Sequence, residues 1–313
     1  MNSVPVQRTD PERFASVAFA QKHPATFIEW NAPECDGPIR IAVVDESPET
    51  SRGTFLLLHG EPSWSALYEE WIPRLVEAGF HCVAVDLPGF GRSDKPSVDD
   101  WYTYERHVEA VRYVIETLNL TRISLVVQDW AGPIGLRQAV DLTDRFDRVF
   151  IFNTWLHHSA YAYSDGARTW RSMATNPDVF GTTMPAGRIV AGTMRRSHDS
   201  DQVAAIFEAP FDSLESRAGA RAFPTMLPFE QPERGGAIEQ ERCHHRLLAG
   251  LGIPVHVAFS DADPVFTYEI GEQWAAAIPG ATMDRIPGAG HFVQYDAPQD
   301  CVDVVLSHIS SEP

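Results

Sequence analysis

The sequence predicts a doubly wound α/β protein with a mostly parallel sheet, and three observations support this fold class. Short apolar runs lack the strict polar and apolar alternation of half-exposed strands, which is typical of strands buried on both faces. Segments with helical periodicity separate these runs, so strands and helices alternate. The alternation stops once, over residues 155–235, and then resumes. The predicted strands are RIAVVD (40–45), TFLLLHG (54–60), HCVAVDL (81–87), ISLVVQD (123–129), RVFIFNT (148–154), IPVHVAF (253–259) and ATMDRIP (281–287).

Three segments between these strands carry apolar residues at a spacing of three and four, which predicts amphipathic helices. They cover residues 65–80, 104–120 and 132–146. The first ends at Gly79, and glycine commonly terminates a helix. The third follows directly after the predicted strand 123–129, so a strand, a turn and a helix succeed one another within a few residues.

Residues 155–235 contain no convincing strand and predict short helices separated by proline, glycine and serine. The alternation of strands and helices resumes near Gln240. We therefore predict a helical cap domain over residues 155–235, inserted after the sixth strand. The core domain then consists of residues 1–154 and 236–313.

The composition excludes several classes of partner. The chain has 313 residues and a formal net charge of −18, which disfavours nucleic acid and anionic membrane surfaces as ligands. No run of 18 apolar residues and no leader-like N-terminus is present, so we expect a cytoplasmic protein without membrane contact. The four cysteines form no CxxC pair, which argues against a metal or redox centre. The sequence leaves the oligomeric state open.

The stretch VVQDWAGPIG predicts a strand, a sharp turn and a helix, with Asp129 at the turn. A nucleophile elbow has this organisation, because its tight turn exposes one side chain at the start of a helix. The usual signature G-x-S-x-G is absent from the chain. Asp129 stands where many hydrolases keep a serine. The alternative is that Asp129 only caps the helix that begins near Gly132.

Two other loops at predicted strand ends carry residues that suit a catalytic triad. His291 lies in GAGHF after the last strand, and Asp263 lies in FSDADP after the strand 253–259. The order of nucleophile, acid and histidine along the chain is then Asp129, Asp263 and His291, the order found in α/β-hydrolases. Asp261 is an alternative acid, but the longer reach beyond the strand favours Asp263.

An aspartate nucleophile indicates a different reaction from that of a serine. A carboxylate displaces a leaving group from an alkyl carbon and becomes an alkyl ester of the enzyme. His291 would then activate the water that attacks the ester, while Asp263 would orient His291 and stabilise its imidazolium form. The backbone N–H groups of Trp130 and Glu61 are placed to stabilise the oxyanion on Asp129. This chemistry needs no metal and no organic cofactor.

The motifs resemble the haloalkane dehalogenases of the α/β-hydrolase superfamily, most closely their first subfamily. The resemblance rests on HGEPSWSALYEEWIPRLVEAGFHCVAVDLPGFGRSDKP and LVVQDWAGPIGL, and it continues in FSDADP, AGHFVQ and PERFAS. It spans nearly the whole chain outside the insert. It implies the α/β-hydrolase fold and the hydrolysis of a small haloalkane by water to an alcohol, a halide ion and a proton. Asp129, His291 and Asp263 fall on the catalytic positions of that family.

By the same resemblance, Trp130 corresponds to a tryptophan of the family whose indole N–H holds the departing halide. The first subfamily usually has a second such tryptophan in the insert. The segment 189–211, where we would expect it, contains Arg195 and no tryptophan, and the insert has only Trp155 and Trp170. Trp170 and Arg195 are therefore the two candidates for the second halide-binding or substrate-binding residue. An arginine would favour an anionic substrate.

Two other functions use features of this sequence. An epoxide hydrolase has the same triad and typically needs two tyrosines in the insert to protonate the opening ring. Tyr161 and Tyr163 lie at the very start of the insert, and no tyrosine occurs from 164 to 267, which counts against this alternative. A binding protein without turnover is the other alternative, and the complete triad argues against it.

Overall fold

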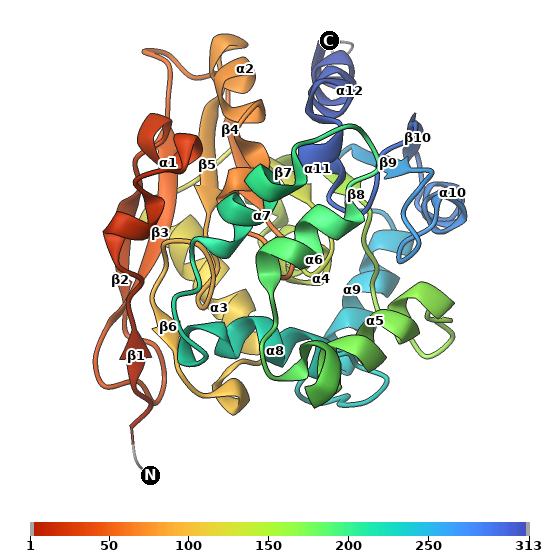
Figure 1. The fold of residues 1–313 in the computed structure, drawn as a ribbon. Coiled ribbons are helices and arrows are strands. Elements are labelled where there is room, and N and C mark those ends of the chain that lie inside the picture. The colour runs from red at the N-terminus through yellow and green to blue at the C-terminus, as the bar shows by residue number, and fades with distance from the viewer. Residues whose placement is uncertain (1–2, 311–313) are drawn as a thin grey trace.

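A computed structural model describes residues 3–310 and contains an eight-stranded sheet in the order β10-β9-β8-β7-β4-β5-β3-β2 (Figure 1). Neighbouring strands are parallel from β10 to β5, whereas β3 is antiparallel to β5 and β2 is antiparallel to β3. The predicted mostly parallel sheet is confirmed. Its strands are β2 (Thr26–Trp30), β3 (Ile39–Glu46), β4 (Thr54–Leu58), β5 (His81–Val85), β7 (Ile123–Val127), β8 (Phe146–Phe152), β9 (Val255–Ser260) and β10 (Thr282–Ile286).

The seven predicted strands are all present, but the prediction missed β2. This strand lies at the edge of the sheet, and only Ile28 and Trp30 of its five residues are buried, so it lacks a long apolar run. The prediction also missed β1 (Val6–Gln7) and β6 (Lys95–Pro96), which pair with each other. Strands of two residues are too short to show any periodicity.

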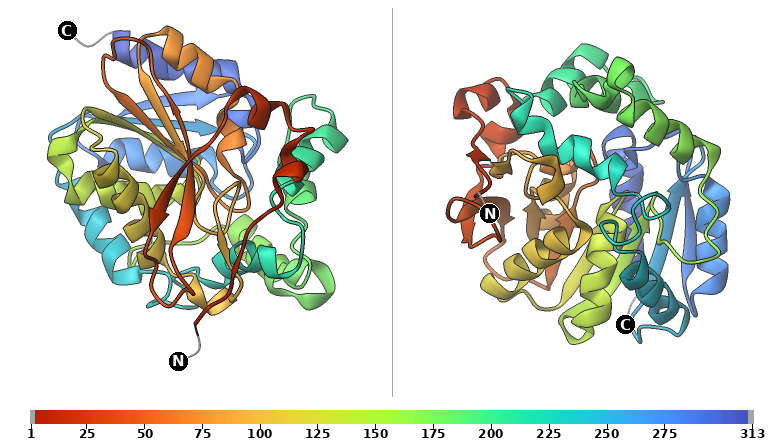
Figure 2. Two further views of the ribbon diagram at one scale, coloured as in Figure 1. Left: turned by 90° about the vertical axis from the view of Figure 1, so that its left-hand side faces the viewer. Right: turned by 90° about the horizontal axis from the view of Figure 1, so that it is seen from below.

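Helices cover both faces of the sheet (Figure 2), and β4 shows why its sequence does not alternate. Leu56 and Leu58 pack into one buried cluster, together with residues of α3 (Tyr104–Thr117) and α4 (Ala131–Asp141). Phe55 and Leu57 pack into the opposite cluster. A strand between two hydrophobic layers needs apolar residues at every position. The remaining core helices are α1 (Ala18–Lys22), α2 (Trp71–Glu77), α9 (Ala237–Leu248), α10 (Tyr268–Ala277), α11 (Val293–Asp296) and α12 (Pro298–Ser310).

The first predicted helix, over 65–80, is divided into two elements. A 3-10 turn, η2 (Ser65–Tyr68), precedes α2, which begins at Trp71. Pro73 lies in the first turn of α2, where its missing N–H costs no hydrogen bond. The proline therefore prevents a continuous helix from running through both segments.

The chain between Trp155 and Gly235 forms helices without a strand, and it is inserted after β8, the sixth strand of the large sheet in chain order. In the right-hand view of Figure 2 these green and teal helices form a layer along one side of the molecule. They are α5 (Asp165–Thr175), α6 (Ala186–Thr193), α7 (Ser200–Glu208) and α8 (Ala218–Thr225), with the short turns η5 (Pro177–Gly181) and η6 (Glu215–Arg217). No helix within residues 3–310 is long and apolar enough to cross a membrane.

Candidate active site

Asp129 occupies the sharp turn between β7 and α4, and its backbone is left-handed with φ 52°. Aspartate and asparagine adopt this conformation more readily than other residues with a side chain. The turn packs against the end of β8, because Asp129 N–H donates to Asn153 O at 2.9 Å and Thr154 Oγ1 donates to Asp129 O at 2.5 Å. A Cβ at Gly132 would lie 1.9 Å from Thr154 Oγ1, so this turn requires a glycine there.

The carboxylate of Asp129 does not cap α4. The N-cap position of α4 is Trp130, and it has no side-chain cap. Asp129 Oδ1 instead accepts a hydrogen bond of 2.8 Å from the backbone N–H of Glu61, and the backbone N–H of Trp130 also stabilises this carboxylate. A Cβ at Gly60 would lie 2.6 Å from Asp129 Oδ1, so the loop needs a glycine to approach so closely. The helix-cap alternative is therefore wrong.

The structure brings His291 and Asp263 into line with Asp129. His291 Nδ1 lies 2.9 Å from Asp263 Oδ2, and His291 Nε2 lies 3.7 Å from Asp129 Oδ2. The alternative acid, Asp261, lies elsewhere, because it accepts hydrogen bonds from Arg285 Nε at 2.8 Å and from Gly288 N–H at 2.6 Å. If Nδ1 carries the proton shared with Asp263, Nε2 is left as the basic nitrogen that faces Asp129.

Burial and charge act in opposite directions on this group of residues. Burial raises the pKa of Asp129, and the charge of His291 and the two backbone N–H groups only partly offset this. Burial alone would lower the pKa of His291, but the charge and hydrogen bond of Asp263, together with the charge of Asp129, outweigh it and raise the pKa above its ordinary value. A histidine with a raised pKa next to a carboxylate is a common feature of catalytic sites.

The sequence analysis did not assign Asn153 a function in the site, yet this residue holds the acid in place. Asn153 Nδ2 donates to Asp263 Oδ2 at 2.8 Å, and Val265 N–H donates to Asp263 Oδ1 at 2.7 Å. Gln128 contacts the histidine instead, because its Nε2 donates to His291 O at 3.1 Å. Both are polar residues at the ends of apolar runs. This pattern is visible in the sequence, but it does not reveal which residue each side chain contacts.

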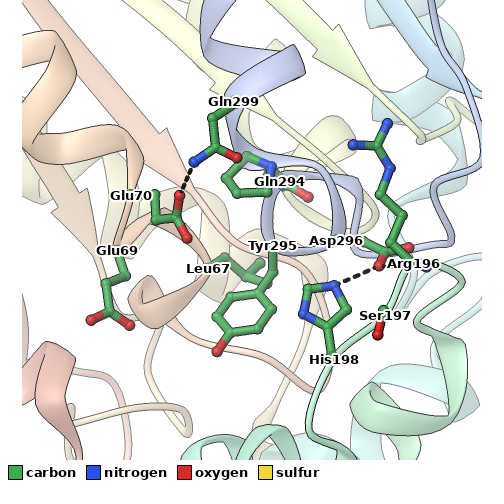
Figure 3. A pocket seen from close by; sticks show the side chains of 11 residues that line it. Leu67, Glu69, Glu70, Arg196, Ser197, His198, Gln294, Tyr295, Asp296 and Gln299 are labelled. Carbon is green, nitrogen blue, oxygen red and sulfur yellow. Dashed lines mark hydrogen bonds and ion pairs between the residues drawn. The ribbon is translucent and has the colours of Figure 1, made fainter.

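Asp296 connects the loop of His291 to the cap. Its buried carboxylate accepts from Gly290 N–H at 2.6 Å, next to His291, and from Arg195 N–H at 2.9 Å in the loop between α6 and α7. The same carboxylate also accepts a hydrogen bond from Arg196 N–H at 3.1 Å and lies 2.8 Å from His198 Nε2. Figure 3 shows Asp296, Arg196 and His198 along a surface cleft of about 290 Å³. No residue of the predicted triad lines this cleft.

We expect Asp296→Asn to lower both stability and turnover. An amide offers one acceptor oxygen and turns its NH₂ toward N–H donors, so at least one charge-assisted hydrogen bond is lost, at a cost of about 1.5–3 kcal/mol in the free energy of unfolding. His291 then loses its fixed position, and we expect kcat to fall about tenfold. Denaturant unfolding and steady-state kinetics measure both. Asp303→Asn, at an exposed ion pair with Arg74, is the control, and equal behaviour of the two variants would contradict the prediction.

A small cavity adjoins Asp129. Its volume is about 20 Å³, which is room for roughly one water-sized group. Trp130 from the core and Trp155, Tyr163 and Trp170 from the insert line it with apolar neighbours, and no basic side chain does so. Within residues 3–310, no group of three or more His, Cys, Asp or Glu side chains is arranged to hold a metal ion.

The two candidates for the second halide-binding residue lie in different places. Trp170, on α5, lines the cavity with Asp129 and Trp130. Arg195 does not, because its Nη1 donates to Gly192 O and Met194 O, both at 3.2 Å, on the exterior. Arg195 is therefore not placed to contact a substrate in this cavity. The backbone N–H of Arg195 donates to Asp296 Oδ2 at 2.9 Å, which ties this loop to the end of α11.

Comparisons with known proteins cover most of this chain. The family model of the alpha/beta hydrolase fold matches residues 53–298. A haloalkane dehalogenase of Psychrobacter cryohalolentis is 34% identical over 310 residues, covering 98% of this chain and 99% of that protein. A haloalkane dehalogenase of Mycolicibacterium paratuberculosis is 38% identical over 274 residues, covering 86% of this chain and 87% of the relative.

A solved structure is also similar over the full length. The tetrameric haloalkane dehalogenase of Paraglaciecola agarilytica superposes with a TM-score of 0.86 at 30% sequence identity, covering 98% of both chains. The two relatives and this solved structure are all named as haloalkane dehalogenases. The protein belongs to the haloalkane dehalogenases of the α/β-hydrolase fold and is a hydrolase that acts on carbon–halogen bonds.

Proposed function

We propose that this enzyme hydrolyses small haloalkanes to an alcohol, a halide ion and a proton through an alkyl ester on Asp129. The observation that carries the proposal is a carboxylate, in place of a serine, on a left-handed turn that faces His291 and a cavity lined by indole rings. We further propose residues 155–235 as the cap domain and residues 1–154 and 236–313 as the core domain.

The first step is a displacement at an sp³ carbon. Asp129 Oδ1 is held by Glu61 N–H, so Oδ2 is the oxygen that attacks. The new C–O bond forms as the carbon–halogen bond breaks, and the electron pair leaves with the halide. An indole N–H is a donor without an acceptor lone pair, and therefore Trp130 and Trp170 are suited to hold the anion as its charge develops.

The second step is hydrolysis of the ester. His291 Nε2 takes a proton from water, which attacks the carbonyl carbon of Asp129, and Asp263 stabilises the imidazolium. The N–H groups of Glu61 and Trp130 stabilise the tetrahedral oxyanion on Oδ1. Collapse of this intermediate breaks the C–O bond to the alkyl group, releases the alcohol and regenerates the carboxylate.

The side chain of Glu61 provides a neutral polar group beside this reaction. It is buried, and burial together with the charge of Asp129 raises its pKa well above the ordinary value. This shift favours the uncharged carboxylic acid, which adds no negative charge next to the nucleophile. Its buried Oε1 has no hydrogen-bond partner in the described chain.

The raised pKa of His291 predicts the pH dependence of hydrolysis. Only neutral His291 accepts a proton, so ester hydrolysis is slow at low pH and becomes faster as pH rises through that pKa. Asp263→Asn removes the charge that holds the proton on His291, and we expect the acidic limb to move to lower pH. Because Asp263 also orients His291, the loss of this orientation should reduce kcat about 10²-fold. Single-turnover rates against pH measure both effects, and Asp261→Asn, outside the triad, should retain the wild-type profile. An acidic limb that stays in place in Asp263→Asn would refute this explanation.

Removal of single indole N–H groups tests halide stabilisation. Trp130→Phe keeps an aromatic ring but loses a hydrogen bond to a developing anion, which corresponds to a decrease in kcat/KM of about 10- to 100-fold. Trp170→Phe should act in the same direction. Both variants should also weaken inhibition by bromide. The control is Trp274→Phe on α10, which does not line the cavity. If all three variants are alike, neither indole holds the halide.

A panel of substrates tests the function itself. Bromo-, chloro- and iodoalkanes should release halide and one proton per turnover. The second candidate, epoxide hydrolysis, gains one observation from the structure: Tyr163 lines the cavity, and its burial raises the pKa of its hydroxyl, which therefore keeps its proton. Diols formed from an epoxide panel without any halide release would establish that second function in place of the first.

A further inference from the structure

The peptide bond between Gly60 and Glu61 carries one of the two backbone N–H groups that contact the nucleophile. Glu61 N–H donates to Asp129 Oδ1 at 2.8 Å. This peptide bond is trans, so the carbonyl of Gly60 lies in the same rigid plane as Glu61 N–H and points in the opposite direction. The groups that hold Gly60 O therefore also set the direction in which Glu61 N–H points.

Three hydrogen bonds converge on Gly60 O. Ser63 Oγ donates to it at 2.7 Å and Ser63 N–H at 3.0 Å, and His59 Nδ1 lies 2.9 Å away. Leu87 N–H donates to His59 Nε2 at 3.0 Å, so in a neutral ring Nδ1 carries the proton and donates to Gly60 O. Burial lowers the pKa of His59, and this shift favours the neutral ring.

These groups are shielded from water. The side chains of His59 and Ser63 are at most 1% exposed, and Gly60 and Glu61 are buried. In such surroundings hydrogen bonds are stronger than in water, and connected bonds polarise one another. Each donor to Gly60 O therefore increases the positive charge on the Glu61 hydrogen, which faces Asp129. The hydroxyl of Ser63 makes the shortest of the three contacts.

We propose that Ser63 is a positioning residue for ester hydrolysis, because its hydroxyl holds and polarises the peptide whose N–H contacts Asp129 Oδ1. His59 acts on the same carbonyl from the other side. This inference rests on the proposed function and distinguishes its two steps. In the first step Asp129 loses its negative charge, so a stronger donor to Oδ1 does not accelerate it. In the second step charge develops on Oδ1, and the same donor lowers the barrier.

Ser63→Ala tests the proposal by removing the hydroxyl. Rapid mixing with 1-bromobutane gives the first step as the burst of bromide, and intact mass after quenching gives the second as decay of the alkyl-enzyme. We expect ester hydrolysis to slow about 3- to 10-fold, the effect of about one neutral hydrogen bond, while the bromide burst is not slowed. Alkyl-enzyme should therefore accumulate in the steady state. Ser63→Thr keeps the hydroxyl and should restore the rate of hydrolysis.

Ser65→Ala is the matched control. Ser65 is a buried serine of the same loop, and its Oγ has no hydrogen-bond partner among residues 3–310. This variant should keep both rates. A folded Ser63→Ala that hydrolyses the ester at the wild-type rate, or in which both steps slow equally, would overturn the inference. Absence of both bromide release and alkyl-enzyme in the wild type would instead contradict the proposed function.

Two variants of His59 keep the test valid if Ser63→Ala does not fold. His59→Asn and His59→Leu are similar in size, and both lose the acceptor for Leu87 N–H. Only the amide of asparagine offers a donor near the position of Nδ1. We therefore expect His59→Asn to hydrolyse the ester faster than His59→Leu, with equal bromide bursts. Equal rates of hydrolysis in the two folded variants would show that donors to Gly60 O do not assist this step.

Discussion

Replacement of His291 with glutamine is expected to stop the reaction at the ester, so that the protein gains the mass of one alkyl group. The proposed first step uses Asp129 and the indoles that we propose to hold the halide, and it does not need His291. The second step requires a base at Nε2, 3.7 Å from Asp129 Oδ2, and the amide of glutamine is not basic. One equivalent of halide should appear in a burst. Steady-state turnover should then be lower by about 10⁴-fold.

Intact-mass spectrometry after incubation with 1-bromobutane measures the adduct, and peptide mapping locates it on Asp129. The matched control is His81→Gln, since His81 is also paired with a carboxylate, Asp45 Oδ1 at 2.6 Å, but lies at the start of β5 away from the cavity. This control should turn over normally without an adduct. Substrate consumption by the wild type with no adduct in His291→Gln would exclude the two-step mechanism.

Replacement of Asp129 is expected to abolish halide release and, in one variant, to stabilise the fold. Asp129→Asn and Asp129→Ala both lack the nucleophile, so turnover should fall by 10⁴-fold or more, on the order of what removal of a catalytic nucleophile costs. Intact mass must verify the amide, because deamidation regenerates aspartate.

The stability of the two variants should differ. The pKa of Asp129 is raised by burial, so its contribution to stability is fully present below the pKa of the unfolded chain and is lost as pH rises through the folded pKa. At pH 7 Asp129→Asn removes this cost and should raise Tm. Alanine at φ 52° adds about 1 kcal/mol of backbone strain, so Asp129→Ala should melt below Asp129→Asn. Equal Tm values for the three proteins from pH 5 to pH 9 would contradict this account.

Local patterns were sufficient for seven of the eight strands of the large sheet, for the helices near 104–120 and 132–146, and for the placement of the predicted triad in strand-end loops. Buried parallel strands show as apolar runs, and a nucleophile elbow shows as a strand, a turn and a helix within ten residues. Because the carboxyl ends of parallel strands meet at one edge of the sheet, Asp129, Asp263 and His291 could be expected to lie together. The patterns missed the exposed edge strand β2, the two-residue strands β1 and β6, and the division of the helix at Pro73.

What the sequence determined by itself is the sheet, the inserted helices and the residues that its strand-end loops present, since these depend on short-range periodicity and on chain order. Only the tertiary structure decided which insert residues face Asp129. It placed Trp155 and Trp170 in the cavity and Arg195 outside, and it joined Asn153 to Asp263 and Asp296 to the loop of His291. These contacts depend on how the helices of the insert pack over the sheet, and helical periodicity indicates which face of a helix is buried but not which residue it meets.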